Sequence, residues 1–155
     1  MTEPSKTGTR VRVLFVCVGN SCRSPMAEAI ARRLGADVMD ASSAGLAALG
    51  QVQSMTKETL RKNGYSSDGL TSTQIQWHAL RDIHLVINMT GRPNALAPAG
   101  LAKVEDWEVE DPYGEDAATY QRIFEDIERR VAELVQRLRK ESNAGIHGPN
   151  CEPGD

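Results

Sequence analysis

An apolar strand that runs directly into a short loop and then a helix is the feature that most constrains how this chain can fold. Residues 11–17 (VRVLFVC) are nearly all apolar and β-branched or aromatic, which is typical of a strand buried on both faces of a parallel sheet. After the loop, Ser24 is suited to cap a helix and Pro25 suits its first turn. The junction therefore predicts the first strand and the first helix of an α/β domain.

Further strands and helices alternate along the chain. We expect strands at 38–44, 83–89 and 101–109, and helices at 24–34, 54–62, 71–80 and 115–141. The last helix has the clearest pattern, because apolar residues recur at helical spacing from Tyr120 to Leu138. This alternation predicts a right-handed α/β domain with a small parallel sheet.

The length of the chain limits its organisation. At 155 residues it has room for one domain with a proper core, which we place at 11–141. The lead-in 1–10 is predicted to be disordered, and the tail 142–155, rich in glycine and proline, is predicted to be flexible. In such a domain, ligands bind beyond the carboxyl ends of the strands, and the first strand ends at Cys17.

Composition and charge exclude several classes of function. The net charge of −3 gives no support for a nucleic-acid partner, and no run of about 20 apolar residues is present that would span a membrane. Residues 1–10 lack the apolar segment of a signal peptide. We therefore expect a cytoplasmic protein whose three cysteines stay reduced, and an odd count does not suit a disulfide framework.

Sites for metals and nucleotides have equally little support. Cys17 and Cys22 lack the Cys-x2-Cys spacing of a zinc site, and the three histidines are scattered. No Walker loop and no Gly-x-Gly-x-x-Gly string occurs. We expect neither a metal nor a cofactor.

The loop after the first strand has the composition of an anion-binding cradle. Between a strand and a helix N-terminus, backbone N–H groups point inward with the helix dipole behind them. Gly19 and Asn20 tolerate the positive φ angles that such a cradle needs, and Arg23 adds a bidentate donor for a tetrahedral oxyanion. Cys17 would lie at the floor of this positive site, where the thiolate is favoured. Ser24 would donate a further hydrogen bond to the sulfur.

A thiolate beneath a bound phosphate has one natural reaction. It attacks phosphorus in line and forms a phosphocysteine, which water then hydrolyses. The leaving group needs a proton from an acid at the same end of the sheet. Asp111 follows the fourth predicted strand and is the best candidate. Tyr113 beside it would pack against a substrate ring.

The stretch from Cys17 to Pro25, with the strand before it and Met-Ala-Glu after it, resembles the low-molecular-weight protein tyrosine phosphatase family. Ser43-Ala44-Gly45 and Asp111-Pro112-Tyr113 match later signatures of that family in the right order, and the similarity covers roughly 11–138. The resemblance implies a single α/β domain with a four-stranded parallel sheet, helices on both faces and metal-free catalysis. It also implies a phosphorylated protein as the substrate, inhibition by phosphate-like oxyanions, and a monomer or weak dimer.

By motif position, the resemblance implies that Cys17 is the nucleophile and that Arg23 binds phosphate and the transition state. Asp111 would be the general acid and then the base that activates water.

The resemblance also implies which residues support the phosphate-binding loop. They are Val18, Gly19, Asn20, Ser21, Cys22, Ser24 and Ser43. Asn20 and Ser43 would hold the loop in its strained shape, and Ser24 would assist the thiolate. Cys22 would form a reversible disulfide with Cys17 and protect it from irreversible oxidation.

Three departures from the family pattern bear on the substrate. Ser21 stands where the phosphotyrosine enzymes usually carry a bulkier apolar residue and the arginine phosphatases carry threonine. The segment 46–54 has no aromatic residue, which leaves Leu46 and Leu49 as wall candidates. Gly114 follows Tyr113 where many eukaryotic members of the family have a second tyrosine, so Tyr113 is the single aromatic wall. We expect phosphotyrosine as the substrate, with phosphoarginine second.

Two alternatives remain open. Arsenate reductases of the same fold also carry a Cys-x-Gly-Asn-Ser-Cys-Arg-Ser loop, but the thioredoxin-coupled members relay a disulfide through two further cysteines after the third strand. Residues 88–96 contain no cysteine, and Cys151 lies in the tail, so this alternative would use a small thiol in trans. A non-catalytic phosphoprotein-binding module would be expected to lack the nucleophile or the acid, yet Cys17 and Asp111 are both present.

Overall fold

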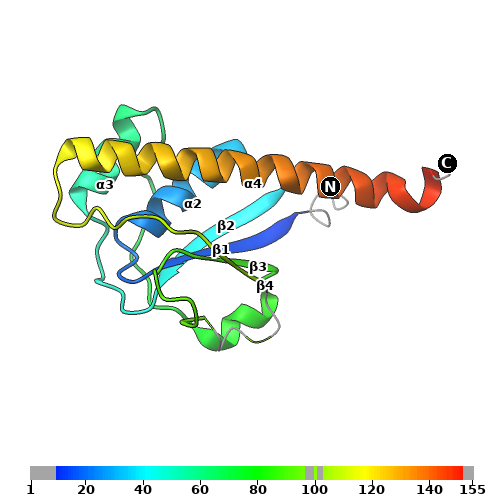
Figure 1. The fold of residues 1–155 in the computed structure, drawn as a ribbon, viewed down its shortest axis with the longest axis horizontal. Helices are drawn as coiled ribbons and strands as arrows, with labels where there is room; N and C mark the ends of the chain where they lie inside the picture. Colours follow the sequence, from blue (N-terminus) through cyan, green and yellow to red (C-terminus); the bar gives the residue numbers. More distant parts are fainter. Residues whose placement is uncertain (1–9, 97–99, 101–102, 152–155) are drawn as a thin grey trace.

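Four parallel strands form the centre of the molecule (Figure 1). The computed structural model describes residues 10–96, 100 and 103–151. The strands are β1 (Val11–Cys17), β2 (Met39–Gly45), β3 (Leu85–Asn88) and β4 (Lys103–Asp106), in the sheet order β2-β1-β3-β4. Every pair of neighbours is parallel, which confirms the predicted fold class.

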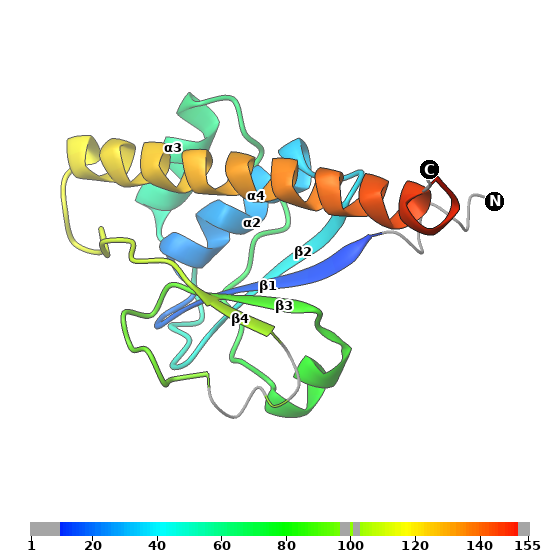
Figure 2. The same ribbon diagram turned by 45° about the vertical axis from the view of Figure 1, so that its right-hand side comes forward.

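The α-helices pack together against one face of this sheet. They are α2 (Arg23–Leu34), α3 (Ser54–Lys62) and α4 (Ala117–Cys151) (Figures 1 and 2). The 3-10 helix η1 (Trp77–Asp82) and the segment before it cover the opposite face. Both faces of the sheet are therefore covered, one by α-helices and the other by a thinner layer.

The composition of β1 explains its place between these layers. Val13 and Phe15 have no exposed surface and pack into the core beneath the α-helices. Leu14 and Val16 point to the opposite face and pack with Leu80 of η1. Successive side chains of a strand point to opposite faces, so a strand that is apolar throughout needs cover on both.

The predicted helix at 71–80 is wrong over most of its length, because only Trp77–Asp82 is helical. The segment before it pairs with the end of β2 instead. Gly45 N donates to the carbonyl of Thr73 (2.9 Å), and Ile75 N donates to the carbonyl of Gly45 (2.9 Å). Backbone groups that pair with a strand are not available for helical hydrogen bonds.

Other boundaries differ less from the sequence predictions. The predicted strands after η1 are longer than β3 and β4, and residues 1–9 and 101–102 lie outside the described part of the chain. α4 extends past Glu141 to Cys151, into the predicted flexible tail, although that stretch contains two glycines and a proline. Neither α4 nor any other helix among the described residues is long and apolar enough to cross a membrane.

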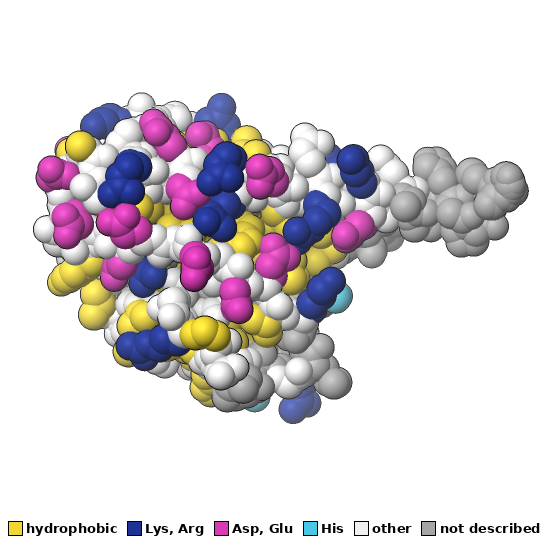
Figure 3. Space-filling view, in the orientation of Figure 1, with side chains coloured by type: hydrophobic (Ala, Val, Ile, Leu, Met, Phe, Trp, Pro, Cys, Tyr) yellow, Lys and Arg dark blue, Asp and Glu magenta, His cyan; other side chains and the backbone are white. Residues whose placement is uncertain are grey.

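The surface over α4 is polar, as the charged residues of this helix predict. Figure 3 shows lysine and arginine side chains interspersed with acidic ones over the helix. Several form ion pairs within the helix, such as Arg129 with Asp126 (2.6 Å). This face is a solvated helix surface, and the loops that carry chemistry lie elsewhere, at the carboxyl edge of the sheet.

Candidate active site

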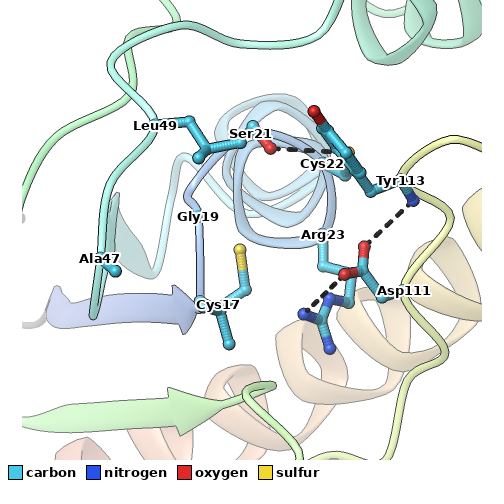
Figure 4. A pocket seen from close by; sticks show the side chains of 10 residues that line it. Cys17, Gly19, Ser21, Cys22, Arg23, Ala47, Leu49, Asp111 and Tyr113 are labelled. Atoms are coloured by element: carbon cyan, nitrogen blue, oxygen red, sulfur yellow. Dashed lines mark hydrogen bonds and ion pairs between the residues drawn. The ribbon is translucent and has the colours of Figure 1, made fainter.

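A pocket of about 330 Å³ opens at the carboxyl edge of the sheet, where β1 meets α2 (Figure 4). It is lined by Cys17, Val18, Gly19, Ser21, Cys22, Arg23, Ala47, Leu49, Asp111 and Tyr113. All of these except Ala47 are residues that the sequence predicts for the site. The fold thus brings together side chains from three separate loops.

The loop after β1 presents unpaired backbone N–H groups. Four of its carbonyls accept hydrogen bonds of 2.8–3.1 Å from N–H groups of the segment 46–53, namely those of Cys17, Val18, Gly19 and Ser21. In a planar trans peptide the C=O and the following N–H point in opposite directions, so these N–H groups point away from that segment. No acceptor for the N–H groups of 18–22 is found among the described residues. Orphan donors at a helix N-terminus are the arrangement that binds anions.

Asn20 fixes the shape of this loop from behind. Its backbone has a φ of 48°, in the left-handed region that asparagine tolerates better than most residues, as predicted. Its fully buried side chain accepts a hydrogen bond from Thr73 N at Oδ1 (2.7 Å). Its amide Nδ2 donates to Ser24 Oγ (2.7 Å) and to Ser43 Oγ (3.0 Å).

These bonds determine where the two serine protons point. Because Asn20 donates to both hydroxyl oxygens, each serine directs its own proton elsewhere. Ser24 Oγ lies 3.0 Å from Cys17 Sγ and donates to the sulfur. Ser43 Oγ lies 2.5 Å from Glu28 Oε1 and donates to that carboxylate. The network therefore supplies the sulfur of Cys17 with a hydrogen-bond donor.

The prediction that Ser24 caps α2 is wrong. The helix begins at Arg23, Cys22 occupies the cap position, and no side chain makes a capping bond there. The hydroxyl of Ser24 is instead engaged by Asn20 and Cys17, so it serves the sulfur and not the helix end.

Glu28 belongs to this network, although the sequence analysis did not identify it. It lies on α2, is only 6% exposed, and forms an ion pair with Arg32. Burial raises the pKa of the Glu28 carboxyl, while the hydrogen bond from Ser43 and the charge of Arg32 oppose that rise. A glutamate and an arginine four residues apart ordinarily form an exposed ion pair on a helix surface. The spacing of Glu28 and Arg32 in the sequence therefore predicts a surface position for Glu28.

Arg23 is buried beside the pocket, and two backbone carbonyls orient its guanidinium. Nη1 donates to the carbonyls of Met89 (2.6 Å) and Val109 (3.3 Å). Nη2 lies 3.5 Å from Asp111 Oδ2, and the buried Nε has no hydrogen-bond partner among the described residues. Nε and Nη2 are adjacent donors of the fork, so an oxyanion in the pocket can accept from both.

Asp111 brings an acid to the same pocket from the loop after β4. Its Oδ1 accepts a hydrogen bond from Tyr113 N (3.1 Å), and its side chain is 51% exposed. Figure 4 shows its carboxyl group beside the guanidinium of Arg23, across the pocket from Leu49. This position lets it exchange protons with water and with a group bound in the pocket.

The mouth of the pocket has exposed walls. Leu49 and Tyr113 are 55% and 54% exposed, and they stand on opposite sides with Ser21 between them (Figure 4). The positive φ predicted for Gly19 is wrong. The glycine supplies space instead, since a Cβ there would lie 3.0 Å from Leu49 Cγ.

Leu46, predicted as a second wall, does not line the pocket. It is half-buried and packs with the apolar cluster on the opposite face of the sheet, which includes Val16 and Ile75. Ala47 takes its place at the pocket. Residues 46–47 form a turn after β2, and their N–H groups donate to the carbonyls of Cys17 and Val18, which places Ala47 beside the loop after β1.

Cys22 also lines the pocket, but its sulfur has a different environment from that of Cys17. Its Sγ lies 3.3 Å from Tyr120 Oη and 3.7 Å from Ser21 Oγ. Burial raises the pKa of the Cys22 thiol, and the hydrogen bonds around it only partly oppose this. Both cysteines are free thiols, and a disulfide between them stays a prediction.

No metal site is evident in the ranges that the structure describes, where no three His, Cys, Asp or Glu side chains converge. His84 is exposed, and its Nδ1 accepts a hydrogen bond from Arg12 N (2.9 Å). The groups available at the pocket are therefore a cysteine sulfur, a guanidinium, backbone donors and a carboxyl.

Comparison with known proteins places this arrangement among enzymes. The glutaredoxin arsenate reductase of Synechocystis sp. is 32% identical over 129 residues, which are 82% of this chain and 98% of that protein. The structure of an arsenate reductase in the phosphate binding state has a TM-score of 0.76 at 32% identity and covers 83% of this chain and 98% of its own. The arginine phosphatase YwlE from Geobacillus stearothermophilus has a TM-score of 0.75 at 26% identity, with coverages of 84% and 94%.

The family model for low molecular weight phosphotyrosine protein phosphatase matches residues 12–144. That range includes the four described strands apart from Val11, the loop after β1 and the acid at Asp111. The chain therefore belongs to the low molecular weight phosphotyrosine protein phosphatase family.

Proposed function

We propose that the protein is a cysteine-dependent phosphatase that hydrolyses phosphorylated protein side chains, with phosphotyrosine as its first substrate class and phosphoarginine as the second. The observation that carries this proposal is the joint presence of three groups at one pocket. They are a sulfur with a hydroxyl donor, an arginine with an unpartnered buried Nε, and an acid within 3.5 Å of that arginine.

In the first step the Cys17 thiolate attacks phosphorus, and the bond from phosphorus to the leaving oxygen or nitrogen breaks. Asp111, in its protonated form, gives its proton to the leaving atom. The backbone N–H groups of the loop and the free donors of Arg23 hold the phosphoryl oxygens and stabilise the charge of the transition state.

In the second step Asp111, now a carboxylate, takes a proton from water, and the water oxygen attacks phosphorus. The sulfur–phosphorus bond breaks, inorganic phosphate leaves, and the thiolate of Cys17 is regenerated. Ser24 donates to the sulfur in both steps, so it also stabilises the thiolate as the leaving group. Inorganic phosphate is expected to act as a competitive inhibitor, because it fits the same cradle.

The size and the apolar walls of the pocket mouth favour a phosphate that carries an organic group. The pocket volume of about 330 Å³ is roughly ten times the volume of about 30 Å³ that a water molecule occupies in the liquid, so the pocket has room for more than an oxyanion. Leu49 and Tyr113 offer apolar surface on two sides of this space. An aryl group attached to the phosphate would bury that surface, whereas a bare oxyanion would not.

Arsenate reduction is a second candidate, supported by the arsenate reductases among the similar proteins. In that reaction the Cys17 thiolate would attack arsenic and displace hydroxide. A second thiol would then reduce arsenic from the pentavalent to the trivalent state and form a disulfide. Since residues 88–96 contain no cysteine, the second thiol would come from a small thiol in trans.

The two candidates are separated by assaying one preparation on two substrates. The hydrolysis of p-nitrophenyl phosphate is measured at pH 5 to 8 with EDTA and a reducing agent present, for the wild type and for Cys17→Ser. In parallel, arsenate reduction is measured with a reduced small thiol as electron donor. We expect hydrolysis that resists EDTA and disappears in the variant. Arsenate reduction without hydrolysis would replace the first proposal with the second.

A further inference from the structure

Arg23 depends on two segments that are not part of the pocket. Its Nη1 is held by the carbonyl of Met89, just after β3, and by the carbonyl of Val109, just after β4. These two bonds turn Nε and Nη2 toward the anion site. Whatever fixes the two carbonyls relative to each other therefore fixes the fork that receives the phosphoryl group.

Asn88, the last residue of β3, joins these two segments. Its Nδ2 donates to Asp106 Oδ1 (2.9 Å), at the end of β4, and to the carbonyl of Arg92 (3.1 Å). Its Oδ1 accepts hydrogen bonds from Thr90 N (3.0 Å) and Thr90 Oγ1 (2.7 Å). Its own backbone carbonyl accepts from Trp107 N (2.9 Å). The side chain thus uses the full capacity of an amide group, which is two donors and two acceptors.

An asparagine is an unusual residue at the buried position of Asn88. It is 3% exposed at the end of an otherwise apolar buried strand, where an apolar side chain would be the ordinary occupant. A buried amide is costly unless its groups are hydrogen-bonded. Its bonds close the turn around Met89 on one side and hold the end of β4, three residues before Val109, on the other.

We propose that Asn88 is a positioning residue for Arg23, which acts through the carbonyls of Met89 and Val109. Asn88 does not line the pocket, so its effect on the bound anion would be transmitted only through the guanidinium. The inference rests on the proposed function for its kinetic consequences, but its effect on anion binding does not require turnover.

The test exchanges the donor and the acceptor of one hydrogen bond. Asn88→Asp removes both donors and sets two carboxylates against each other at the 2.9 Å contact with Asp106. Asp106→Asn removes the charge but keeps the shape. The double variant Asn88→Asp/Asp106→Asn restores a donor–acceptor pair with the roles reversed, and the acceptors for Thr90 are kept.

Asn63→Asp is the matched control. Asn63 is also a partly buried asparagine, and its Nδ2 donates to Thr59 O (2.7 Å) and to Gln121 Oε1 (2.8 Å). The substitution makes the same chemical change as Asn88→Asp. The hydrogen bonds of Asn63 join α3 to α4 and involve no residue that holds Arg23. Thermal unfolding of all variants measures how much each change weakens the fold.

The dissociation constant for inorganic phosphate is measured by titration calorimetry, and kcat and KM on p-nitrophenyl phosphate are measured separately. For Asn88→Asp we expect phosphate binding weakened about tenfold and kcat/KM lowered by roughly 10- to 100-fold, as the partial loss of a charge-assisted bidentate contact would give. The double variant should recover most of both losses. Asn63→Asp should lower Tm about as much as Asn88→Asp does. Its phosphate dissociation constant and its kcat/KM should nevertheless stay within about twofold of the wild type.

Unchanged phosphate binding in a folded Asn88→Asp would overturn the inference, and so would equal losses in Asn88→Asp and Asn63→Asp. If Asn88→Asp does not fold, Asp106→Ala carries the same test, because it removes the acceptor for Asn88 Nδ2 at an exposed position; weaker phosphate binding is then expected, and unchanged binding would contradict the inference. A wild type that binds phosphate but shows no turnover would count against the proposed function alone, because the binding comparison still decides the role of Asn88.

Discussion

The floor and the mouth of the pocket differ in how firmly they are held. At the floor, Cys17 and Arg23 are at most 6% exposed; Ser24 donates a hydrogen bond to the sulfur of Cys17, and Arg23 donates one to the carbonyl of Met89. At the mouth, Leu49 and Tyr113 are more than half exposed. The floor is therefore preorganised for one tetrahedral anion, while the mouth can accept different groups attached to it.

This difference explains how one fold serves several reactions. Proteins called arsenate reductase and arginine phosphatase share this architecture with the chain, and the substrates that those names imply, arsenate and a phosphoryl group, are both tetrahedral. A floor that binds the oxyanion does not choose between them. Substrate choice then depends on the mouth and on the supply of protons or thiols, so substitutions at the two levels should have separable effects.

The largest effect is expected from Asp111→Asn. The variant keeps the shape of the carboxyl group but cannot give a proton, so turnover should fall by about 10²- to 10⁴-fold, the range of a general acid. The loss should be greater for phosphotyrosine peptide than for p-nitrophenyl phosphate, whose leaving group needs less help. The measurement is kcat on both substrates. Near-normal turnover of the peptide would remove Asp111 from the mechanism.

A smaller effect is expected from disturbing the floor at Asn20. Asn20→Gly and Asn20→Ala both lose the bonds to Thr73, Ser24 and Ser43, so kcat/KM should fall roughly 10- to 100-fold. Asn20→Ala also forces a Cβ-bearing side chain with no polar group onto a φ of 48°, which should lower the free energy of unfolding by about 1 kcal/mol more than glycine does. Equal stability of the two variants would show that the loop relaxes out of this conformation.

We expect substitutions at the mouth to change KM for an organic substrate and to leave anion binding at the floor unchanged. Tyr113→Ala and Leu49→Ala each remove apolar surface that an aryl group would cover, so KM for phosphotyrosine peptide should rise by roughly three- to tenfold. The inhibition constant of inorganic phosphate should stay within about twofold, because phosphate contacts only the floor. A parallel rise in that constant would mean that the mouth also shapes the anion site.

The smallest effect concerns Glu28 and pH. Burial raises the pKa of Glu28 above its ordinary value of 4.5, so the folded state holds more protons than the unfolded state in the window just above that value. Stability contributed by this group is therefore present at lower pH and is lost as pH rises through the folded pKa. Relative to Glu28→Gln, the wild type should lose stability as the pH rises from 4.5 toward neutrality, as measured by thermal unfolding across that range. A difference that grows with pH would mean that Arg32 and Ser43 outweigh burial.

The parts that the sequence predicts well are those that local patterns determine. The strand 11–17, the anion cradle and the long amphipathic helix follow from side-chain type and spacing within one segment. The residues at the floor of the pocket are predictable because they form nearly one continuous stretch from Cys17 to Arg23. The position of Asp111 at the pocket is predictable because it follows a strand at the same edge of the sheet.

The parts that were missed depend on distant contacts. The segment 71–76 is extended because Gly45 pairs with it, and nothing within the segment signals this. Ala47 lines the pocket in place of Leu46, because hydrogen bonds to the loop after β1 set the position of the backbone after β2. Glu28 and Asn88 act through partners on other elements, so their types alone do not distinguish them from surface residues.

The most direct test of the account is the detection of the covalent intermediate. Enzyme at a concentration near that of p-nitrophenyl phosphate is mixed rapidly and quenched in acid, and the phosphorylated residue is identified by mass spectrometry, for the wild type and for Cys17→Ser. We predict a burst of p-nitrophenol that approaches one equivalent per active site when hydrolysis of the intermediate is slow, with phosphate on Cys17, and no burst in the variant. Steady hydrolysis without phosphate on Cys17, or hydrolysis that persists in Cys17→Ser, would contradict the account.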